Sequence, residues 1–118
     1  MTDYTIYHNP RCSKSRQTLA LLEENGVAPT IVKYLDDTPD AATLQTLINQ
    51  LGLEKAHDLV RNKEADYSTA GLTPDSSDKD VIAAMVAYPK LIERPIVVRG
   101  QKAVLGRPPE NVLSLLAK

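Results

Sequence analysis

The first 35 residues carry a strand pattern, a break, a helix pattern and a second strand pattern, and this order restricts the fold more than any other feature. Tyr4 to His8 alternates polar and apolar residues, and Asn9-Pro10 interrupts the alternation. A helix pattern begins at Ser13 and ends at Gly26, a residue suited to terminate a helix, and Thr30 to Leu35 predicts a second strand. A strand–helix–strand unit of this length predicts two parallel strands joined by a right-handed crossover.

The middle of the chain is different, because nearly fifty residues show helical periodicity interrupted by loop signals. One helix is predicted from its capping residue Asp40 to Leu51, and a weaker helical segment over Lys55–Arg61. Ser68–Ser77 reads as a loop, and another helix is predicted from its capping residue Asp78 to Tyr88. We therefore expect a helical insertion at about residues 40–88.

The last third returns to strands. Pro95–Arg99 and Lys102–Leu105 flank Gly100-Gln101, which predicts a tight antiparallel hairpin, and a final helix is expected over Glu110–Ala117. The complete order is β-α-β, a helical insertion, then β-β-α. This order predicts an α/β fold with a thioredoxin-like mixed sheet, formed by a single domain over residues 1–118.

Composition narrows the possible partners. The formal net charge is −1, which argues against broad electrostatic binding to nucleic acid or to an acidic membrane. No apolar run approaches the roughly 18 residues that a membrane span needs. No basic segment followed by an apolar one opens the sequence, so we expect no secretory signal. The expectation is a monomeric cytoplasmic protein.

The single cysteine, Cys12, stands where the first strand should give way to the first helix. A lone cysteine is more often a small buried hydrophobic residue, but Arg11, Lys14 and Arg16 make this loop polar and cationic. Free backbone N–H groups and the positive end of the helix dipole stabilise a thiolate and attract oxyanions. One cysteine allows neither an internal disulfide nor a zinc site built on cysteine pairs, and no metal is expected.

Three neighbours of the cysteine are candidate supports for its thiolate. His8 lies at the predicted end of the first strand and could act electrostatically. The hydroxyl groups of Ser13 and Ser15 could donate hydrogen bonds to the sulfur. For Ser13, the alternative is a simple helix cap.

Three arginines occupy predicted element boundaries, namely Arg61, Arg94 and Arg107. Surface arginines are common, but three at boundaries together with a positioned cysteine suggest convergence on an oxyanion, which guanidinium groups bind in bidentate fashion. Arg99, beside the hairpin turn, is expected to be solvated. The Arg94-Pro95 bond is a candidate cis peptide bond, because the thioredoxin-like arrangement usually places a cis-proline beside its active thiol.

Several motifs occur together in a fixed order: His-Asn-Pro-x-Cys-x-x-Ser-Arg at residues 8–16, Arg61, Glu-Arg-Pro-Ile-Val-Val at 93–98 and Gly-Arg-Pro-Pro-Glu at 106–110. They resemble those of the ArsC-like, glutaredoxin-coupled arsenate reductases over nearly the whole chain. Arg11 and the Gly-Arg-Pro-Pro-Glu run are more similar to a housekeeping, YfgD-type branch of that family.

The resemblance implies a thioredoxin-like fold with a helical insertion, and an enzyme without a bound cofactor. By this resemblance, Cys12 attacks arsenate, and the three arginines named above hold the oxyanion. His8 and Ser15 lower the pKa of the thiol. Glutathione is the implied co-substrate and glutaredoxin the implied partner, and one cysteine is consistent with the need for an external thiol.

Two other functions remain open. Cys12 and Ser15 have the spacing of a monothiol, glutathione-dependent thiol–disulfide oxidoreductase, although the arginines have no role in that function. The chain is also similar to Spx-type transcription regulators, which bind RNA polymerase and sense oxidation through Cys-x-x-Cys. Ser15 stands where the second cysteine of that switch would be.

Overall fold

The computed structural model describes residues 4–116 and divides into two compact units. The first, which we call the sheet unit, comprises Met1–Asp37 and Arg94–Lys118. The second, the helical unit, comprises Thr38–Glu93, close to the insertion that the sequence predicts. The organisation as a single domain stays a prediction.

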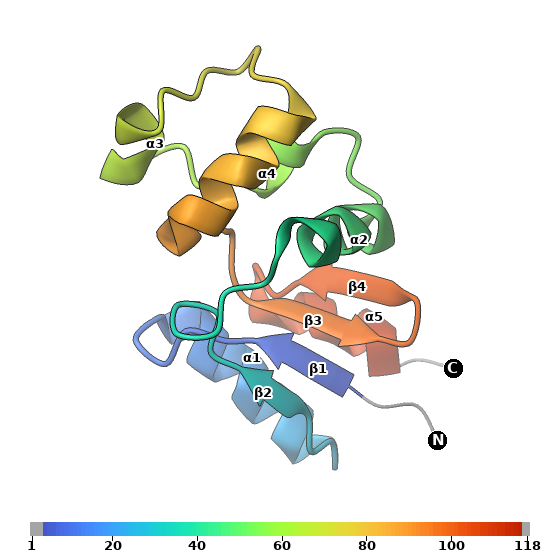
Figure 1. The fold of residues 1–118 in the computed structure, drawn as a ribbon. Helices are drawn as coiled ribbons and strands as arrows, with labels where there is room; N and C mark the ends of the chain where they lie inside the picture. Colours follow the sequence, from blue (N-terminus) through green and yellow to red (C-terminus); the bar gives the residue numbers. More distant parts are fainter. Residues whose placement is uncertain (1–3, 117–118) are drawn as a thin grey trace. The chain divides into compact units, whose positions relative to one another are not determined.

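The sheet unit is built on a four-stranded mixed sheet with the strand order β2-β1-β3-β4 (Figure 1). The central strand β1 pairs in parallel with β2 and antiparallel with β3, and β3 pairs antiparallel with β4. The strands are β1 (Tyr4–Tyr7), β2 (Thr30–Val32), β3 (Ile96–Arg99) and β4 (Lys102–Leu105). This confirms the predicted α/β, thioredoxin-like mixed sheet, including the parallel first pair and the hairpin.

The second strand is shorter than the sequence predicts. β2 ends at Val32 because the following residues turn: the backbone N–H groups of Asp36 and Asp37 both donate to the carbonyl of Lys33, at 2.9 and 2.8 Å. The predicted extension to Leu35 is therefore wrong, and residues 33–37 form a turn at the end of the strand.

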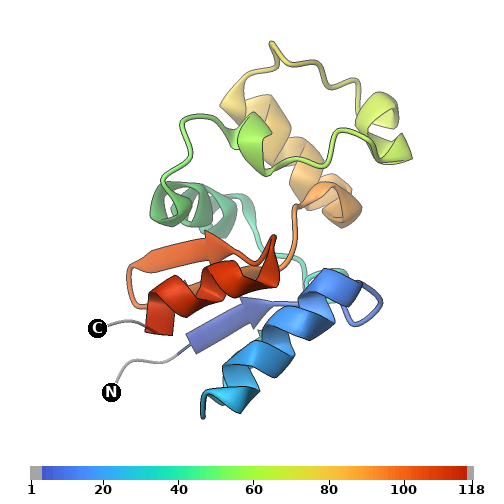
Figure 2. The same cartoon turned by 180° about the vertical axis from the view of Figure 1, so that it is seen from behind.

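Helices cover one face of this sheet (Figure 2). Helix α1 (Ser13–Glu24) is followed by Gly26, whose φ of +79° is readily available to glycine, so the predicted terminator is confirmed. The last helix is not one continuous helix. It consists of a 3₁₀ turn, η3 (Pro109–Val112), and a short helix, α5 (Leu113–Leu116); Ala117 lies outside the described residues.

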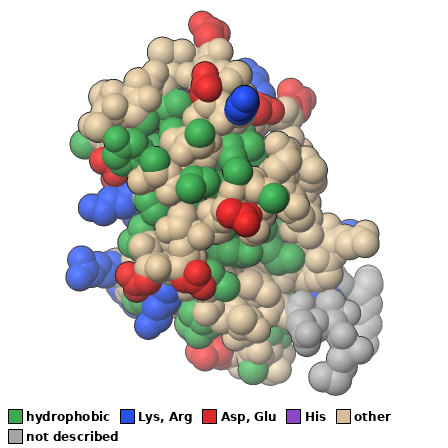
Figure 3. Space-filling model, in the orientation of Figure 1, with side chains coloured by type: hydrophobic (Ala, Val, Ile, Leu, Met, Phe, Trp, Pro, Cys, Tyr) green, Lys and Arg blue, Asp and Glu red, His purple; other side chains and the backbone are tan. Residues whose placement is uncertain are grey.

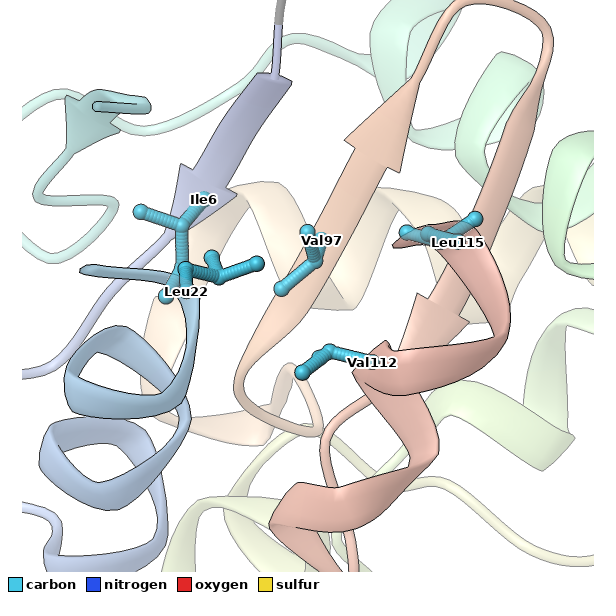
Figure 4. Close-up of a cluster of buried hydrophobic side chains, with 5 residues drawn as sticks. All are labelled: Ile6, Leu22, Val97, Val112 and Leu115. Atoms are coloured by element: carbon cyan, nitrogen blue, oxygen red, sulfur yellow. The ribbon is translucent and has the colours of Figure 1, made fainter. Parts of the chain in front are cut away.

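An aliphatic core joins these helices to the sheet (Figure 4). Ile6 and Val97 come from the two central strands, Leu22 comes from α1, and Val112 and Leu115 come from the C-terminal helical turns. All five are buried, and the chain contains no Phe or Trp that could fill this space instead. Burying a side chain of this size contributes about 1.5–3 kcal/mol, so this core fixes α1, and with it the cysteine loop, against β1 and β3.

The helical unit contains three α-helices and two 3₁₀ turns. In chain order they are α2 (Ala41–Leu51), η1 (Ala56–Leu59), α3 (Ala65–Thr69), α4 (Asp78–Ala87) and η2 (Pro89–Leu91). Within residues 4–116 no helix combines the length and apolar character needed to cross a membrane.

The first helix of this unit begins and ends as its sequence predicts. The side chain of Asp40 accepts a hydrogen bond from the backbone N–H of Thr43 at 2.8 Å, which satisfies one of the free donors of the first turn of α2. Gly52 ends the helix in the left-handed region, with a φ of +73°. The capping signals at both ends are confirmed.

The cap of α4 differs from the prediction by one residue. Ser77, not Asp78, is the N-cap, and its hydroxyl accepts a hydrogen bond from the backbone N–H of Asp80 at 3.2 Å. Asp78 is the first helical residue, and its carboxylate accepts a hydrogen bond from the backbone N–H of Ala56 at 3.0 Å. Asp78 therefore links α4 to η1, which local pattern alone does not reveal.

Two further predictions for this unit need correction. The weak helix expected over Lys55–Arg61 is the 3₁₀ turn η1, four residues long. The segment expected to be a loop from Ser68 contains the end of α3, a helix of five residues that the loop-forming residues around it conceal.

Candidate active site

Cys12 is the N-cap residue of α1 and is partly exposed. Its backbone is extended, with φ −92° and ψ 122°, while its carbonyl accepts the N–H of Arg16 at 3.0 Å and starts the helix. Its own N–H donates to the carbonyl of Asn9 at 3.0 Å. The chain therefore turns sharply from strand into helix at this residue, and the thiol lies beside the unpaired amides of the first helical turn.

The surroundings of the thiol favour its anionic form. Partial burial raises the pKa of Cys12, but the backbone N–H of Ser15, the Arg94 side chain by hydrogen bond and charge, and the backbone N–H of Lys14 outweigh it, so that the pKa lies below its ordinary value. Although the thiol makes no capping hydrogen bond, the backbone N–H groups of Ser15 and Lys14 at the start of the helix favour its anionic form. The predicted activation of Cys12 thus rests on Arg94 and two backbone groups.

Ser15 supports the thiol through its backbone, and its hydroxyl is committed elsewhere. The hydroxyl oxygen accepts the backbone N–H of Asn9 at 3.0 Å and lies 2.6 Å from Nδ1 of His8. Both Ser15 and His8 are buried. Burial, then the charges of Lys33 and Arg16, lower the pKa of His8, which favours a neutral imidazole. His8 is therefore suited to hold Ser15 rather than to act on the thiolate as a cation.

Ser13 occupies a different place from the one expected of a cap. It is the first residue of α1, exposed, and follows the capping position that Cys12 takes. It is not among the groups that shift the pKa of Cys12. The interpretation of Ser13 as the helix cap is wrong, and its support of the thiolate stays a prediction.

Asn9 organises the cysteine loop, although it is not among the site residues predicted from the sequence. Its side-chain oxygen accepts the N–H of Arg11 at 3.0 Å, in addition to the two backbone bonds to Cys12 and Ser15. Arg16 donates from Nη1 to the carbonyl of Pro10 at 2.8 Å and closes the loop from the other side. Asparagine before proline is a turn signal, and that signal could have identified this role.

Arg94 reaches Cys12 from the segment that precedes β3, and its peptide bond to Pro95 is cis. Tyr34, fully buried, lies in the same group of residues. Burial raises the pKa of Tyr34 to about 12 against the lowering effects of the Arg94 charge and of Asn9. The phenol is thus a neutral polar group beside the arginine that faces the thiol. Sequence patterns did not single it out, because a tyrosine after a strand carries no local signal of such a contact.

The loop that carries Arg107 is held against the same proline. The N–H of Gly106 donates to the carbonyl of Pro95 at 2.9 Å, and the hydroxyl of Thr18, on α1, donates to the carbonyl of Gly106 at 3.3 Å. Arg107 is exposed and donates from Nη1 to the carbonyl of Arg94 at 3.3 Å. Its bond to Pro108 is also cis. Arg107 therefore contacts the backbone of Arg94, whose side chain reaches Cys12.

Arg61 lies in the helical unit and has acidic neighbours. Its Nη1 is 3.6 Å from a carboxylate oxygen of Glu64, and its Nε is 3.7 Å from one of Glu93. Its backbone N–H donates to the carbonyl of Leu91 at 2.7 Å. The role of Arg61 in oxyanion binding stays a prediction.

The expectation that Arg99 is solvated is wrong. Its guanidinium carbon lies 5.3 Å from the ring centroid of Tyr4, a cation–π contact, and its Nη1 donates to the carbonyl of Leu115. Arg99 thus joins β1 to the C-terminal helical turn. Its task is structural, and it does not face the cysteine.

The site therefore combines a thiol with a lowered pKa, free helix amides and two guanidinium groups. A thiolate is a soft nucleophile, and the cations beside it can neutralise an incoming tetrahedral anion. Within residues 4–116, no group of three His, Cys, Asp or Glu side chains is placed to hold a metal ion. The chemistry that this arrangement serves best is attack of sulfur on an oxyanion.

The chain belongs to the ArsC family, whose model matches residues 7–115. It is 55% identical over 112 residues to the Escherichia coli K12 protein YfgD, itself described as uncharacterized, and the match covers 94% of each chain. It is 46% identical over 117 residues to the arsenate reductase of Neisseria meningitidis serogroup B, covering 98% of this chain and 100% of that one.

Solved structures agree with this assignment. The arsenate reductase from Vibrio cholerae superimposes with a TM-score of 0.92 at 50% sequence identity, covering 96% of this chain and 97% of that chain. The family predicted from the cysteine loop and the Arg-Pro-Ile-Val strand is thereby confirmed.

Proposed function

We propose that this protein is an arsenate reductase in which the Cys12 thiolate attacks arsenate, and glutathione and glutaredoxin complete the reduction to arsenite. The observation that carries the proposal is the position of Cys12 at the start of α1, with its pKa lowered by helix amides and by Arg94. The names of close relatives support arsenate as the substrate. We place the reaction in the cytoplasm, where thiols are kept reduced, and expect a monomer.

The first step is a substitution at arsenic. The sulfur of Cys12 forms a bond to As(V), and one arsenate oxygen leaves as water after it takes up protons. No electrons are transferred in this step. Arg94 and Arg107, which lie close together, are the proposed anion-binding groups, with Arg61 as the third. Positive charge there stabilises the crowded anionic transition state more than the free anion.

The second step requires outside thiols, because the chain has one cysteine and the reduction needs two electrons. Glutathione displaces a second arsenate oxygen as water and forms a second S–As bond. A thiolate of glutaredoxin then attacks the glutathione sulfur and forms a mixed disulfide, and the electron pair of the broken S–As bond stays on arsenic as As(III). Water releases arsenite and restores the thiol of Cys12, and another glutathione regenerates glutaredoxin.

The test is a coupled assay with arsenate, glutathione, glutaredoxin, glutathione reductase and NADPH. The native protein is expected to consume NADPH in an arsenate-dependent manner, and Cys12→Ser to reduce this to the rate without enzyme, because a serine hydroxyl is not ionised at neutral pH. Native protein without turnover, or undiminished turnover in Cys12→Ser, would refute the proposal.

Two further measurements separate the two alternatives. Release of glutathione from protein mixed disulfides without arsenate turnover would favour a thiol–disulfide oxidoreductase. In that function Arg94 and Arg107 would have no substrate anion to bind. Co-purification with RNA polymerase would favour an Spx-type regulator. Against that function stands Ser15, whose buried hydroxyl is bonded to Asn9 and lies against His8 in place of a second cysteine.

A further inference from the structure

A cavity of about 330 Å³ lies against the cysteine loop on the side of β2. Its lining consists of two stretches of chain, the loop residues His8, Asn9, Pro10 and Arg11, and the turn residues Lys33, Leu35 and Asp36. The volume falls in the range of about 300–1,000 Å³ that is usual for small-molecule sites, and it far exceeds what one tetrahedral anion fills. The cavity therefore has room for a ligand larger than arsenate.

Both walls of the cavity are fixed by hydrogen bonds. Asn9 and Arg16 hold the loop wall through the bonds described above, and the carbonyl of Lys33 accepts two backbone N–H groups in the turn wall. The backbone N–H of His8 donates to the carbonyl of Val32 at 2.8 Å and ties one wall to the other. A cavity with walls held in this way is formed before any ligand arrives, which lowers the entropic cost of binding.

The charges of the lining are mixed. Arg11 and Lys33 are exposed cations and Asp36 is an exposed carboxylate, so the cavity offers two positive groups and one negative group. Basic and acidic side chains gather together over the loops that follow β1 and β2 (Figure 3). A ligand with two carboxylates and one ammonium group complements this set, and a simple anion does not.

The cavity lies next to Cys12 in the chain. Arg11, which lines it, directly precedes Cys12, and consecutive Cα atoms are about 3.8 Å apart. A tripeptide seated there can direct a central side chain toward the arsenic adduct on Cys12 while its charged ends remain in the cavity.

We infer that this cavity is the binding site for the thiol co-substrate, a small peptide thiol with two carboxylates and one ammonium group, as in glutathione. Arg11 and Lys33 bind the carboxylates, and Asp36 binds the ammonium group. The inference rests on the proposed function, since it names where the second thiol of that reaction binds. Held there, the thiol forms its bond to arsenic as a bound reactant rather than by chance collision.

The first experiment needs no arsenate. The Cys12→Ser protein, labelled with ¹⁵N, is titrated with S-methylglutathione, which cannot react. The expected result is saturable shifts of the amide signals of Asn9, Arg11, Lys33 and Asp36. Adding Lys33→Gln should raise the dissociation constant by about three- to fivefold, as expected for loss of one partly exposed ion pair. The matched control is Lys102→Gln, an exposed lysine on β4 outside the cavity, which should change nothing.

The second experiment uses the coupled assay. Lys33→Gln is expected to raise the KM for glutathione by about three- to fivefold and leave the KM for arsenate unchanged. Native and variant protein share the same glutaredoxin, so the difference belongs to this chain. Lys102→Gln, the same charge change outside the cavity, should leave the KM for glutathione at its native value.

The outcomes separate this inference from the proposed function. Arsenate turnover with a glutathione KM and an S-methylglutathione dissociation constant that Lys33→Gln leaves unchanged would overturn the inference while the arsenate reductase survives. Saturable, Lys33-dependent binding of S-methylglutathione without arsenate turnover would support the cavity as a peptide-thiol site and refute the arsenate reaction.

Discussion

The two units of this molecule assemble their polar groups in different ways. In the sheet unit, the cysteine loop, the Arg94-Pro95 segment and the Gly106-Arg107 loop are far apart in sequence and meet through strand pairing and bonds such as Gly106 N–H to Pro95. In the helical unit, the capping side chains of Asp40 and Ser77 act on backbone groups three residues away, whereas Asp78 accepts the N–H of Ala56 from a different element. Long-range strand pairing therefore brings the residues of the candidate site together, whereas local signals mainly determine where helices begin and end.

The contrast extends to the arginines of the two units. Arg94 faces a thiol and lowers its pKa, whereas Arg61 has the carboxylates of Glu64 and Glu93 as neighbours. A guanidinium with two acidic neighbours has less positive potential to offer a substrate. This difference can be tested directly.

The largest effect is expected for Arg94→Ala, which removes a charge beside both the thiol and the incoming anion. We expect kcat/KM for arsenate to fall by about 10²–10³, the usual cost of losing one preorganised donor to a transition state. The alkylation of Cys12 by iodoacetamide should also slow at neutral pH, because the pKa of the thiol rises. The matched variant is Arg61→Ala, for which alkylation should stay at the native rate. Equal slowing in both variants would remove the distinction between the two arginines.

The pH dependence of alkylation sharpens the same point. The pKa of Cys12 lies below its ordinary value, so the thiolate persists at pH values where free cysteine is protonated. The alkylation rate is therefore maximal above the ordinary pKa of a cysteine thiol. It falls as the pH drops through the lowered pKa of Cys12. The midpoint of the rate against pH should lie below that of free cysteine in the native protein, and should move up in Arg94→Ala. The midpoint reports the pKa of the thiol, whereas the absolute rate also depends on how easily iodoacetamide reaches the sulfur. A native midpoint equal to that of free cysteine would contradict the assignment.

Gly106→Ala probes the long-range contact that holds the Arg107 loop. A Cβ at this position would lie 2.8 Å from Cγ of Pro95 and closer still to the hydroxyl of Thr18. Overpacking of this kind costs about 1–3 kcal/mol, so we expect a lower midpoint of urea unfolding.

The control for Gly106→Ala is the double variant with Thr18→Ala, which deletes two of the three nearest atoms. Part of the lost free energy of unfolding should return, as for residues in contact. Strictly additive losses would show that the two side chains do not compete for this space.

The sequence predicted those parts of the sheet unit that depend on local pattern. Alternation marked β1, a turn marked the hairpin, and Gly26 marked the end of α1. The cationic character of the cysteine loop was visible as well. Thr18 and Tyr34 escaped notice because their partners lie elsewhere in the sheet unit: Thr18 is bonded to Gly106, 88 residues away. Asn9 differs, because its partners lie in its own loop and its turn signal was visible in the sequence. The sequence pattern indicates which element carries a polar residue, but the tertiary structure determines its hydrogen-bond partner.

Two wrong assignments have the same cause. Arg99 beside a turn looked solvated, yet Tyr4 and the carbonyl of Leu115 are its partners. Ser77 and Asp78 are both good capping residues, and the local sequence did not distinguish them. The tertiary structure distinguishes them. The carboxylate of Asp78 accepts a hydrogen bond from the backbone N–H of Ala56, and the hydroxyl of Ser77 caps the helix.

The smallest predicted effect concerns that cap. The hydroxyl of Ser77 accepts one free N–H of the first turn of α4, so Ser77→Ala should lower the free energy of unfolding by about 1 kcal/mol. Ser77→Asp keeps an acceptor and places a negative charge at the positive end of the helix, so it should retain the native stability. Urea unfolding of the three proteins measures both. The start of α1 differs from the start of α4. The N-cap residue of α1, Cys12, makes no capping hydrogen bond, so the amides of its first turn remain available to a thiolate. If Ser77→Ala proved as stable as the native protein, a capping bond would be worth nothing here, and the uncapped start of α1 would cost this chain nothing.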